Sequence, residues 1–258
     1  MLHLQFYIQS LEFIMHTETI SYRHGQLELR GHLVYNNKIE TARPAVIVAH
    51  AWKGQDEFAR NKARALAELG YIAFAVDIYG EGKEVETSDE AAALMMPLFL
   101  DRQLLQERMK AAYDVVSNHP MVNAKMIGGI GFCFGGLAII ELFRSGVDLR
   151  GVVSFHAVLG DEMGENKAKI VPIAQGIKGS LLMLHGYDDP LVSAKDIETK
   201  EQEFTQANVD WQLHVYGHTS HAFTVPGAND KSLGLIYNPK ANQRSWKAMR
   251  NFFDEVFI

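Results

Sequence analysis

The stretch from residue 125 to residue 144, KMIGGIGFCFGGLAIIELFR, constrains the fold of this chain more than any other. It opens with the apolar run of a buried strand, turns on glycines, and continues with the apolar spacing of a helix. The only cysteine, Cys133, lies at the turn in the order Gly-Phe-Cys-Phe-Gly-Gly. A residue at such a turn has strained backbone angles, and a Cβ two positions to either side would meet the adjoining strand and helix. The pattern predicts a side chain displayed at a sharp strand-to-helix turn.

The chemistry of this position suits a nucleophile. A thiol at the start of a helix faces free backbone N–H groups and the positive end of the helix dipole, and both favour the thiolate. The alternative is that a lone cysteine acts as a small buried apolar residue, which is the usual role of an intracellular cysteine. The remainder of the chain has to decide between the two.

Composition limits the class of protein. At 258 residues, with 47% hydrophobic and 22% charged residues, the chain has the size and composition of one large α/β domain or two small ones. The net charge of −6 and the lack of a basic run give no reason to expect nucleic acid or an anionic membrane as a partner. A single cysteine excludes an internal disulfide and a cysteine-based metal cluster, and it is typical of a reducing, cytoplasmic protein. We expect no cofactor and no metal, and composition does not indicate an oligomeric state.

The first residues, MLHLQFYIQSLEFIM, are apolar but lack the basic start and the small-residue cleavage site of a signal peptide. They are also too short to span a bilayer. We therefore expect residues 1–18 to form an N-terminal extension or arm, and residues 19–258 to form one domain.

Strand and helix patterns alternate along the rest of the chain, which predicts a mostly parallel sheet with helices on both faces. Residues 18–35 read as an antiparallel hairpin that turns at His24 and Gly25. In such a sheet, ligands bind at the carboxyl ends of the strands. Strands are expected at 45–50, 72–77, 126–132, 151–155, 180–185 and 211–216, and helices at 58–69, 88–118, 137–143, 194–206 and 242–256.

Candidate partners for the thiol follow the last two predicted strands. A thiol needs a base, and the base needs a third group to orient it. Asp189 is the preferred acid because the following proline fixes the turn that aims its carboxylate, with Asp188 second; a simple turn and helix cap is the structural alternative. Of two candidate bases, His221 lies deeper in its loop and is followed by Ala-Phe, whereas His218 is the candidate for a solvated loop histidine.

Other residues complete the expected site. The backbone N–H of Phe134 and that of Trp52, in a tight turn after an apolar strand, are candidates for an oxyanion hole. Trp52, Phe132, Tyr79 and Glu81 are expected to line the substrate pocket.

Four segments carry a resemblance to a known family: G-F-C-F-G-G, H-G-Y-D-D-P-L-V, Y-G-H-T-S-H-A-F, and A-L-A-E-L-G-Y followed by V-D-I-Y-G. From about residue 19 onward, the chain resembles the dienelactone hydrolase (carboxymethylenebutenolidase) family. The resemblance implies a single α/β-hydrolase domain and a triad of Cys133, His221 and Asp189. It implies hydrolysis of small esters or lactones, and possibly thioesters, through an acyl-enzyme. A non-catalytic ligand-binding protein on the same fold and an acyl transferase are the alternatives.

The chain departs from the family pattern at three places. Ala51 stands where the family often has a glutamate that helps to hold the thiol proton. Glu81 and Val225 fall where the resemblance would place two arginines that bind a substrate carboxylate. We therefore expect neutral esters or lactones to be preferred over carboxylate-bearing ones.

Overall fold

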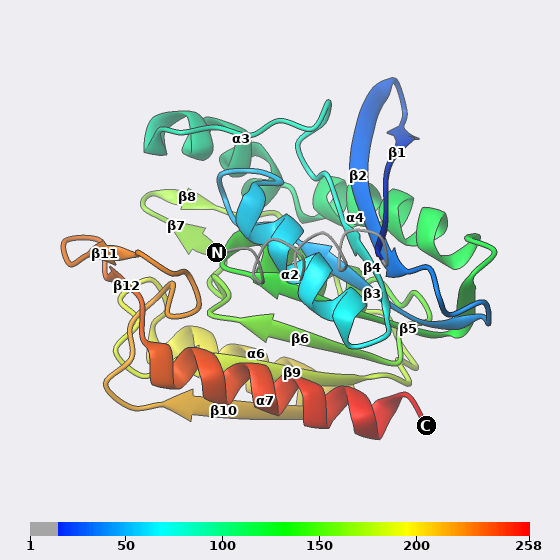
Figure 1. The fold of residues 1–258 in the computed structure, drawn as a ribbon. Coiled ribbons are helices and arrows are strands. Elements are labelled where there is room, and N and C mark those ends of the chain that lie inside the picture. Colours follow the sequence, from blue (N-terminus) through cyan, green and yellow to red (C-terminus); the bar gives the residue numbers. More distant parts are fainter. Residues whose placement is uncertain (1–14) are drawn as a thin grey trace, which may run out of the picture.

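The computed structural model describes residues 15–258, and its centre is an eight-stranded sheet in the order β1-β2-β4-β3-β5-β6-β9-β10 (Figure 1). The first two strands form an antiparallel hairpin, and β2 also pairs antiparallel with β4. All other neighbours in the sheet are parallel. The strands are β1 (Met15–His24), β2 (Leu27–Asn36), β3 (Arg43–Ala49), β4 (Ile72–Ala75), β5 (Val122–Phe132), β6 (Gly151–Phe155), β9 (Ser180–Gly186) and β10 (Asp210–Tyr216).

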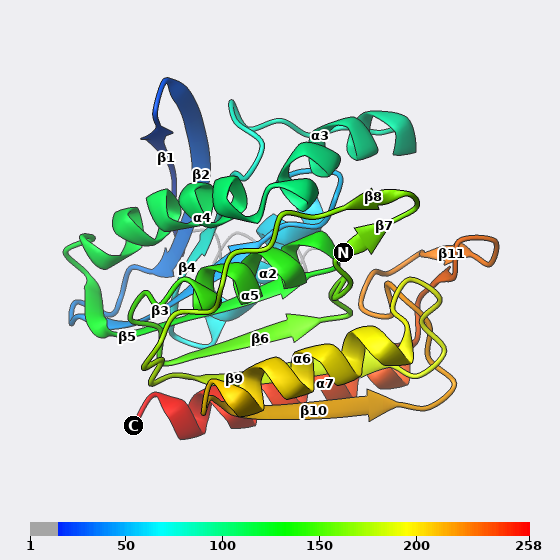
Figure 2. The ribbon, with the colours of Figure 1, turned by 180° about the vertical axis from the view of Figure 1, so that it is seen from behind.

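Helices cover both faces of the sheet. In Figure 1, α2 (Glu57–Glu68) and α7 (Pro239–Val256) lie in front of the sheet. The reverse view in Figure 2 shows α4 (Arg102–Ser117), α5 (Phe134–Arg144) and α6 (Ala194–Gln206) on the other face, with α3 (Ser88–Leu100) above them. Each face has its own buried apolar cluster because the buried strands present apolar side chains in both directions.

The predicted α/β architecture with an N-terminal hairpin is confirmed, including the turn after His24. The predicted helix over 88–118 is two helices, because Asp101 ends α3 with an extended backbone and its side chain caps α4 by accepting a hydrogen bond from the Leu104 N–H (3.0 Å). Residues 15–18, assigned to the arm from the sequence, are paired in β1, while residues 1–14 lie outside the described residues.

Two short hairpins without a sequence prediction lie beyond the carboxyl ends of the parallel strands (Figure 1). They are β7 (Glu162–Met163) with β8 (Asn166–Lys167), and β11 (Asn229–Asp230) with β12 (Leu235–Ile236). Two-residue strands carry too little periodicity to be recognised in a sequence.

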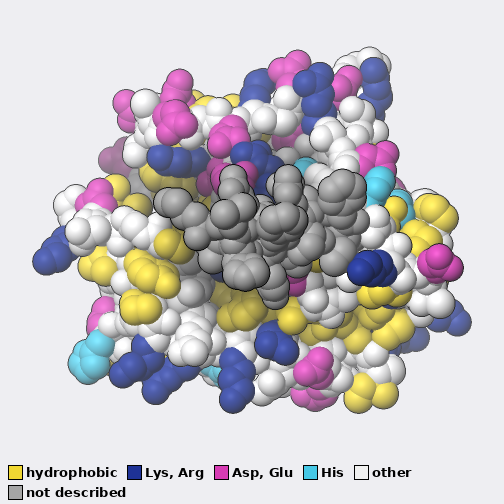
Figure 3. Space-filling view, in the orientation of Figure 1, with side chains coloured by type: hydrophobic (Ala, Val, Ile, Leu, Met, Phe, Trp, Pro, Cys, Tyr) yellow, Lys and Arg dark blue, Asp and Glu magenta, His cyan; other side chains and the backbone are white. Residues whose placement is uncertain are grey.

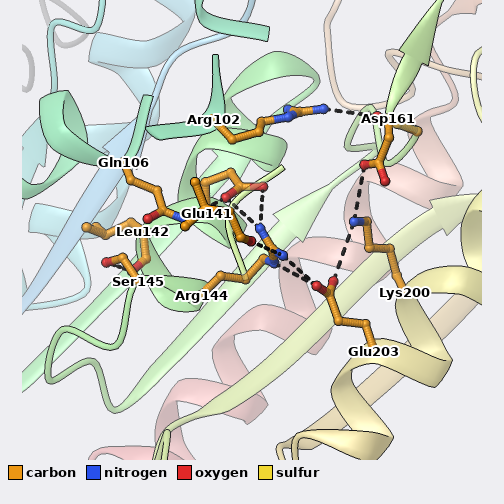
Figure 4. Close-up of polar contacts among 11 residues, drawn as sticks. Arg102, Gln106, Glu141, Leu142, Arg144, Ser145, Asp161, Lys200 and Glu203 are labelled. Atoms are coloured by element: carbon orange, nitrogen blue, oxygen red, sulfur yellow. Dashed lines mark hydrogen bonds and ion pairs between the residues drawn. The ribbon is translucent and has the colours of Figure 1, made fainter. Parts of the chain in front are cut away.

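A buried network of charged side chains ties α5 to its neighbours (Figure 4). Arg144, 1% exposed, donates two hydrogen bonds to the equally buried Glu141 (2.9 and 2.8 Å) and pairs with Glu203 on α6. Gln106 on α4 donates to the other side of this cluster, at 2.8 Å from Glu141. Lys200 extends the network to Asp161, at 3.4 Å. The helix that follows Cys133 is therefore held to α4 by a buried hydrogen bond and to α6 by an ion pair.

On the face shown in Figure 3, both basic and acidic side chains are present outside the grey area. Between residues 15 and 258, every helix is too short or too polar to cross a membrane.

Candidate active site

Cys133 occupies the turn between β5 and α5, as the sequence predicted. Its φ of 55° lies in the left-handed region, where a side chain is strained, and its carbonyl oxygen accepts the Gly136 N–H at 3.0 Å. A Cβ at Gly131 would overlap the carbonyl oxygen of Gly135, and one at Gly135 would overlap that of Ala49. The glycines therefore let strand and helix approach closely enough to display a partly exposed thiol.

His221 and Asp189 form a buried pair. Nδ1 of His221 donates to Oδ2 of Asp189 over 2.7 Å, and both side chains are at most 1% exposed. The other carboxylate oxygen, Oδ1, accepts the Leu191 N–H at 2.9 Å. The two alternative candidates, Asp188 and His218, are exposed to solvent. Of the residues that the sequence left open, Asp189 and His221 are therefore the two that are buried and hydrogen-bonded to each other.

Hydrogen bonds join the loop after β9, which contains Asp189, to the loop after β10, which contains His221. The Asp188 N–H donates to the Thr219 carbonyl at 2.9 Å, and the Ser220 hydroxyl donates to the Asp188 carbonyl at 3.1 Å. Gly186 allows this contact, because a Cβ there would overlap the Thr219 carbonyl oxygen. On its other side, the His221 carbonyl accepts the Ile236 N–H at 3.0 Å, which attaches the β11–β12 hairpin to the histidine.

The electrostatics of His221 couple it to the thiol. Burial disfavours the proton on its ring, but the negative charge of a Cys133 thiolate and the hydrogen bond to Asp189 outweigh burial and raise the pKa of His221 to about 10. Nε2 is buried and has no hydrogen-bond partner among residues 15–258. It belongs to a ring that lines the same cavity as Cys133. The raised pKa means that the His221 ring holds its proton when a negative charge is present beside it.

A second histidine, His156, packs edge-on against His221 with ring centroids 5.0 Å apart. Burial, followed by the charge of His221, holds the pKa of His156 well below its usual range, so its ring is neutral at physiological pH. Its Nε2 lies 2.7 Å from the Thr224 hydroxyl. The position of His156 at a strand end was the only sequence signal for this contact.

The two expected oxyanion donors are available. Neither the Phe134 N–H nor the Trp52 N–H donates a hydrogen bond within residues 15–258. The Phe134 N–H belongs to the first turn of α5, where it has no partner within the helix. Trp52 is positioned by Tyr79, whose hydroxyl donates to the Trp52 carbonyl at 2.8 Å.

Three of the four residues expected to line the substrate pocket do not reach it. Phe132 is fully buried on the α2 and α7 face, where it packs against Phe58 and Phe155. The cause is strand alternation: Gly129 and Gly131 face α5, so Phe132 faces the opposite way. Tyr79 is 4% exposed and supports Trp52 from behind.

Glu81 also lies away from the cavities, and its carboxylate pairs with Lys83 at 3.4 Å. The turn that contains it is organised by Asp77. The buried Asp77 carboxylate accepts four backbone N–H groups, from Arg30, Tyr79, Gly80 and Gly82, at 2.7 to 3.0 Å. The polar residues at the end of β4 therefore build a turn rather than a substrate contact.

Two cavities adjoin the thiol. They share Trp52, Cys133 and Leu235, and have volumes of about 270 and 360 Å³. The smaller, cavity A, contains both histidines and is further lined by Ala51, Lys53, Asp56, Phe58, Ala222, Val225, Ala228, Asn229 and Asp230. The larger, cavity B, is further lined by Met95, Val158, Glu162, Met163, Gly164, Leu191 and Leu233. Of the substrate-binding residues expected from sequence, only Trp52 lines these cavities.

Comparison with known proteins places this site in a family. The sequence model of the dienelactone hydrolase family matches residues 30–257. The chain belongs to the dienelactone hydrolase family. As a family member it is a hydrolase acting on ester or lactone bonds.

Solved structures and curated relatives agree with this assignment. A solved chain named m3DLH is 38% identical and superimposes with a TM-score of 0.87 over 95% of this chain and 100% of its own. A dienelactone-hydrolase-like promiscuous phosphotriesterase from metagenomic libraries is 33% identical, with a TM-score of 0.86 and the same coverage of both chains. A putative carboxymethylenebutenolidase of Yersinia pestis is 27% identical over 216 residues, which are 82% of this chain and 78% of that protein.

Proposed function

We propose that this dienelactone hydrolase family member cleaves esters and lactones with Cys133 as nucleophile, His221 as base and Asp189 as the acid that orients the base. The observation that carries the proposal is the buried His221–Asp189 hydrogen bond of 2.7 Å, next to a cysteine at a strained strand-to-helix turn. With Nδ1 committed to Asp189, the remaining ring nitrogen, Nε2, is the one able to exchange a proton with the thiol.

The reaction follows from these positions. The Cys133 thiolate adds to the carbonyl carbon of the substrate, and the resulting oxyanion accepts the N–H groups of Phe134 and Trp52. Collapse of this adduct breaks the bond to the leaving oxygen, which takes the proton held on His221. Water then attacks the thioester while His221 removes its proton, and the acid product leaves with the thiol regenerated.

Activation of the thiol has to proceed without the glutamate that many family members carry at the position of Ala51. Cys133 is the residue at the N-terminal cap of α5, where backbone N–H groups and the helix dipole stabilise negative charge. The His221 ring supplies the positive partner: burial lowers its pKa, but the charge of the thiolate and the hydrogen bond to Asp189 outweigh burial and raise the pKa to about 10. An ion pair between the Cys133 thiolate and the His221 imidazolium thus takes the role of the missing glutamate.

The charges around the cavities favour neutral substrates. Three carboxylates, those of Asp56, Asp230 and Glu162, line the two cavities. The single lysine among the lining residues, Lys53, already donates to the Glu86 carbonyl at 2.6 Å. A substrate carboxylate would lose water beside three acidic side chains, and burial of a charge without a paired cation costs several kcal/mol.

A burst experiment tests the nucleophile. Wild-type protein mixed with a para-nitrophenyl ester should release one equivalent of chromophore rapidly, and mass spectrometry of the quenched protein should find the acyl adduct on Cys133. Cys133→Ala should lose the burst, the adduct and turnover while keeping its circular dichroism spectrum. Turnover by folded Cys133→Ala above a few per cent of wild type would reject the proposal.

A further inference from the structure

Resting on this proposed function, we infer that cavity B binds the acyl part of the substrate, and that the substrates are esters or thioesters of neutral, medium-length apolar acyl groups. Cavities A and B have Cys133, Trp52 and Leu235 in common, and Cys133 is the only one of these three with a nucleophilic side chain. A carbonyl carbon at the Cys133 sulfur therefore has one substituent in each cavity. The question becomes which substituent enters which cavity.

Proton delivery decides the orientation. During acylation the sulfur–carbon bond forms, the bond from the carbonyl carbon to the leaving oxygen breaks, and that oxygen takes the proton from His221. The leaving oxygen must therefore lie on the His221 side, and His221 lines cavity A but not cavity B. The acyl substituent is left to enter cavity B.

The lining of cavity B matches an apolar chain. Its wall is made of Trp52 and aliphatic or thioether side chains, with Met95 and Val158 buried at its base. Leu191 and Leu233 also line it while being 44% and 46% exposed, which makes the mouth apolar as well. Packing of an alkyl chain against these leucines is favourable, because it removes apolar surface from water.

The one charged residue of cavity B argues in the same direction. Glu162, the first residue of β7, is exposed, and its carboxylate is 3.5 Å from Nζ of Lys167, its partner on β8. The described residues that line cavity B include no basic side chain that could pair with an acyl chain ending in a carboxylate. The chain that fits is neutral.

Size gives the expected length. At about 30 Å³ for each water-sized group, the ≈ 360 Å³ of cavity B holds a chain of on the order of ten heavy atoms. Burial of one methylene is worth about 0.8 kcal/mol, which corresponds to roughly a fourfold gain in kcat/KM at 1.36 kcal/mol per tenfold. Because the mouth is open, the added methylenes are only partly buried. We therefore expect kcat/KM for a hexanoyl ester to exceed that for an acetyl ester by at least ~20-fold, which is less than the product of four full methylene gains.

The experiment measures kcat/KM of the full chain for para-nitrophenyl esters from acetyl to octanoyl. Met163→Trp fills cavity B and should lower the hexanoyl-to-acetyl ratio at least tenfold. Val225→Trp is the matched control, because it introduces a tryptophan into cavity A instead, and it should leave that ratio within twofold of wild type. A parallel series of acetyl esters with small and large alcohols should show the reverse pattern, with Val225→Trp as the sensitive variant.

Each outcome bears on the orientation. A flat acyl-length profile in the wild type, or a Val225→Trp variant that lowers the acyl ratio as much as Met163→Trp, would overturn the assignment of cavity B. Acyl adducts on Cys133 separate this failure from a failure of the nucleophile. If hexanoyl and acetyl donors both acylate Cys133 at equal rates, only the cavity assignment is wrong; if neither leaves an adduct and Cys133→Ala still turns over, the proposed function is wrong.

Discussion

Replacing Asp189 by asparagine tests how the acid of the site works, because the structure determines how the amide must lie. In the wild type, Oδ1 accepts the Leu191 N–H at 2.9 Å and Oδ2 accepts the His221 Nδ1–H at 2.7 Å. The asparagine oxygen is the only acceptor on the new side chain, and we expect the backbone N–H of Leu191 to keep it. The amide NH₂ group then faces Nδ1, which must become an acceptor, so the ring proton moves to Nε2.

A histidine protonated only on Nε2 cannot remove a proton from the thiol or from water. The variant also loses the carboxylate charge that helps to hold a proton on the ring, and a charge-assisted hydrogen bond is worth about 1.5–3 kcal/mol. In a serine protease, the corresponding change of a buried aspartate lowers kcat about 10⁴-fold through the wrong tautomer. We expect a loss of roughly 10³- to 10⁴-fold in kcat here, with the fold retained.

The assay is kcat for a para-nitrophenyl ester, with ¹⁵N-histidine NMR to read the tautomer of His221. Asp188→Asn is the matched control, since it is the same change at the adjacent, exposed position, and it should stay within about threefold of wild type. An Asp189→Asn variant with more than a tenth of wild-type activity, or one whose His221 keeps its proton on Nδ1, would refute this reasoning.

Four further predictions concern the base, its protonation, the substrate and the framework. His221→Ala should reduce kcat about 10³-fold or more, whereas the exposed His218→Ala should change it less than threefold; a reversed ranking in the ester assay would move the base. The proton on His221 should stabilise the fold fully below its unfolded pKa of about 6.5, and this stability should be lost as pH rises through about 10. Urea unfolding measured from pH 6 to 10 should show this fall in the free energy of unfolding. The fall should be smaller in Cys133→Ala, and a fall of equal size in that variant would contradict the prediction. Esters with a terminal carboxylate should have at least tenfold lower kcat/KM than neutral esters of matched size and leaving group, measured at fixed salt. Glu141→Leu leaves Arg144 buried with one partner fewer, and should lower the free energy of unfolding by about 3–5 kcal/mol in urea titrations; a loss below 1 kcal/mol would mean that the network is not important for stability.

The fold could be predicted from the sequence because its signals are local. Apolar runs with flanking glycines marked the parallel strands, and the order Gly-Phe-Cys-Phe-Gly-Gly marked the turn at Cys133. The choice of Asp189 over Asp188 and of His221 over His218 rested on weaker local cues, and it agrees with the burial of the chosen pair. Neither cue could show that a hydrogen bond joins the two loops.

The substrate side of the site was mostly missed for physical reasons. Phe132 looked like a pocket residue because it is next to the cysteine, but strand alternation turns it to the opposite face. Tyr79 has a supporting role that depends on a contact with Trp52 far away in the sequence. The apolar residues of cavity B, such as Met95 and Leu233, come from separate segments, and nothing in a sequence distinguishes an apolar residue facing a cavity from one facing the core.

The order in which the groups of the site occur along the chain has a consequence for how the protein is made. Cys133 follows β5, Asp189 follows β9, and His221 follows β10, the edge strand that pairs only with β9. Since chains are synthesised from the N-terminus and fold as they emerge, the cysteine is present on the ribosome long before its base. Until β10 docks, the thiol lacks the imidazolium that stabilises its charged form. Under the proposed mechanism, a nascent or truncated chain would carry a less reactive cysteine, and its sensitivity to electrophiles would rise when the sheet is complete.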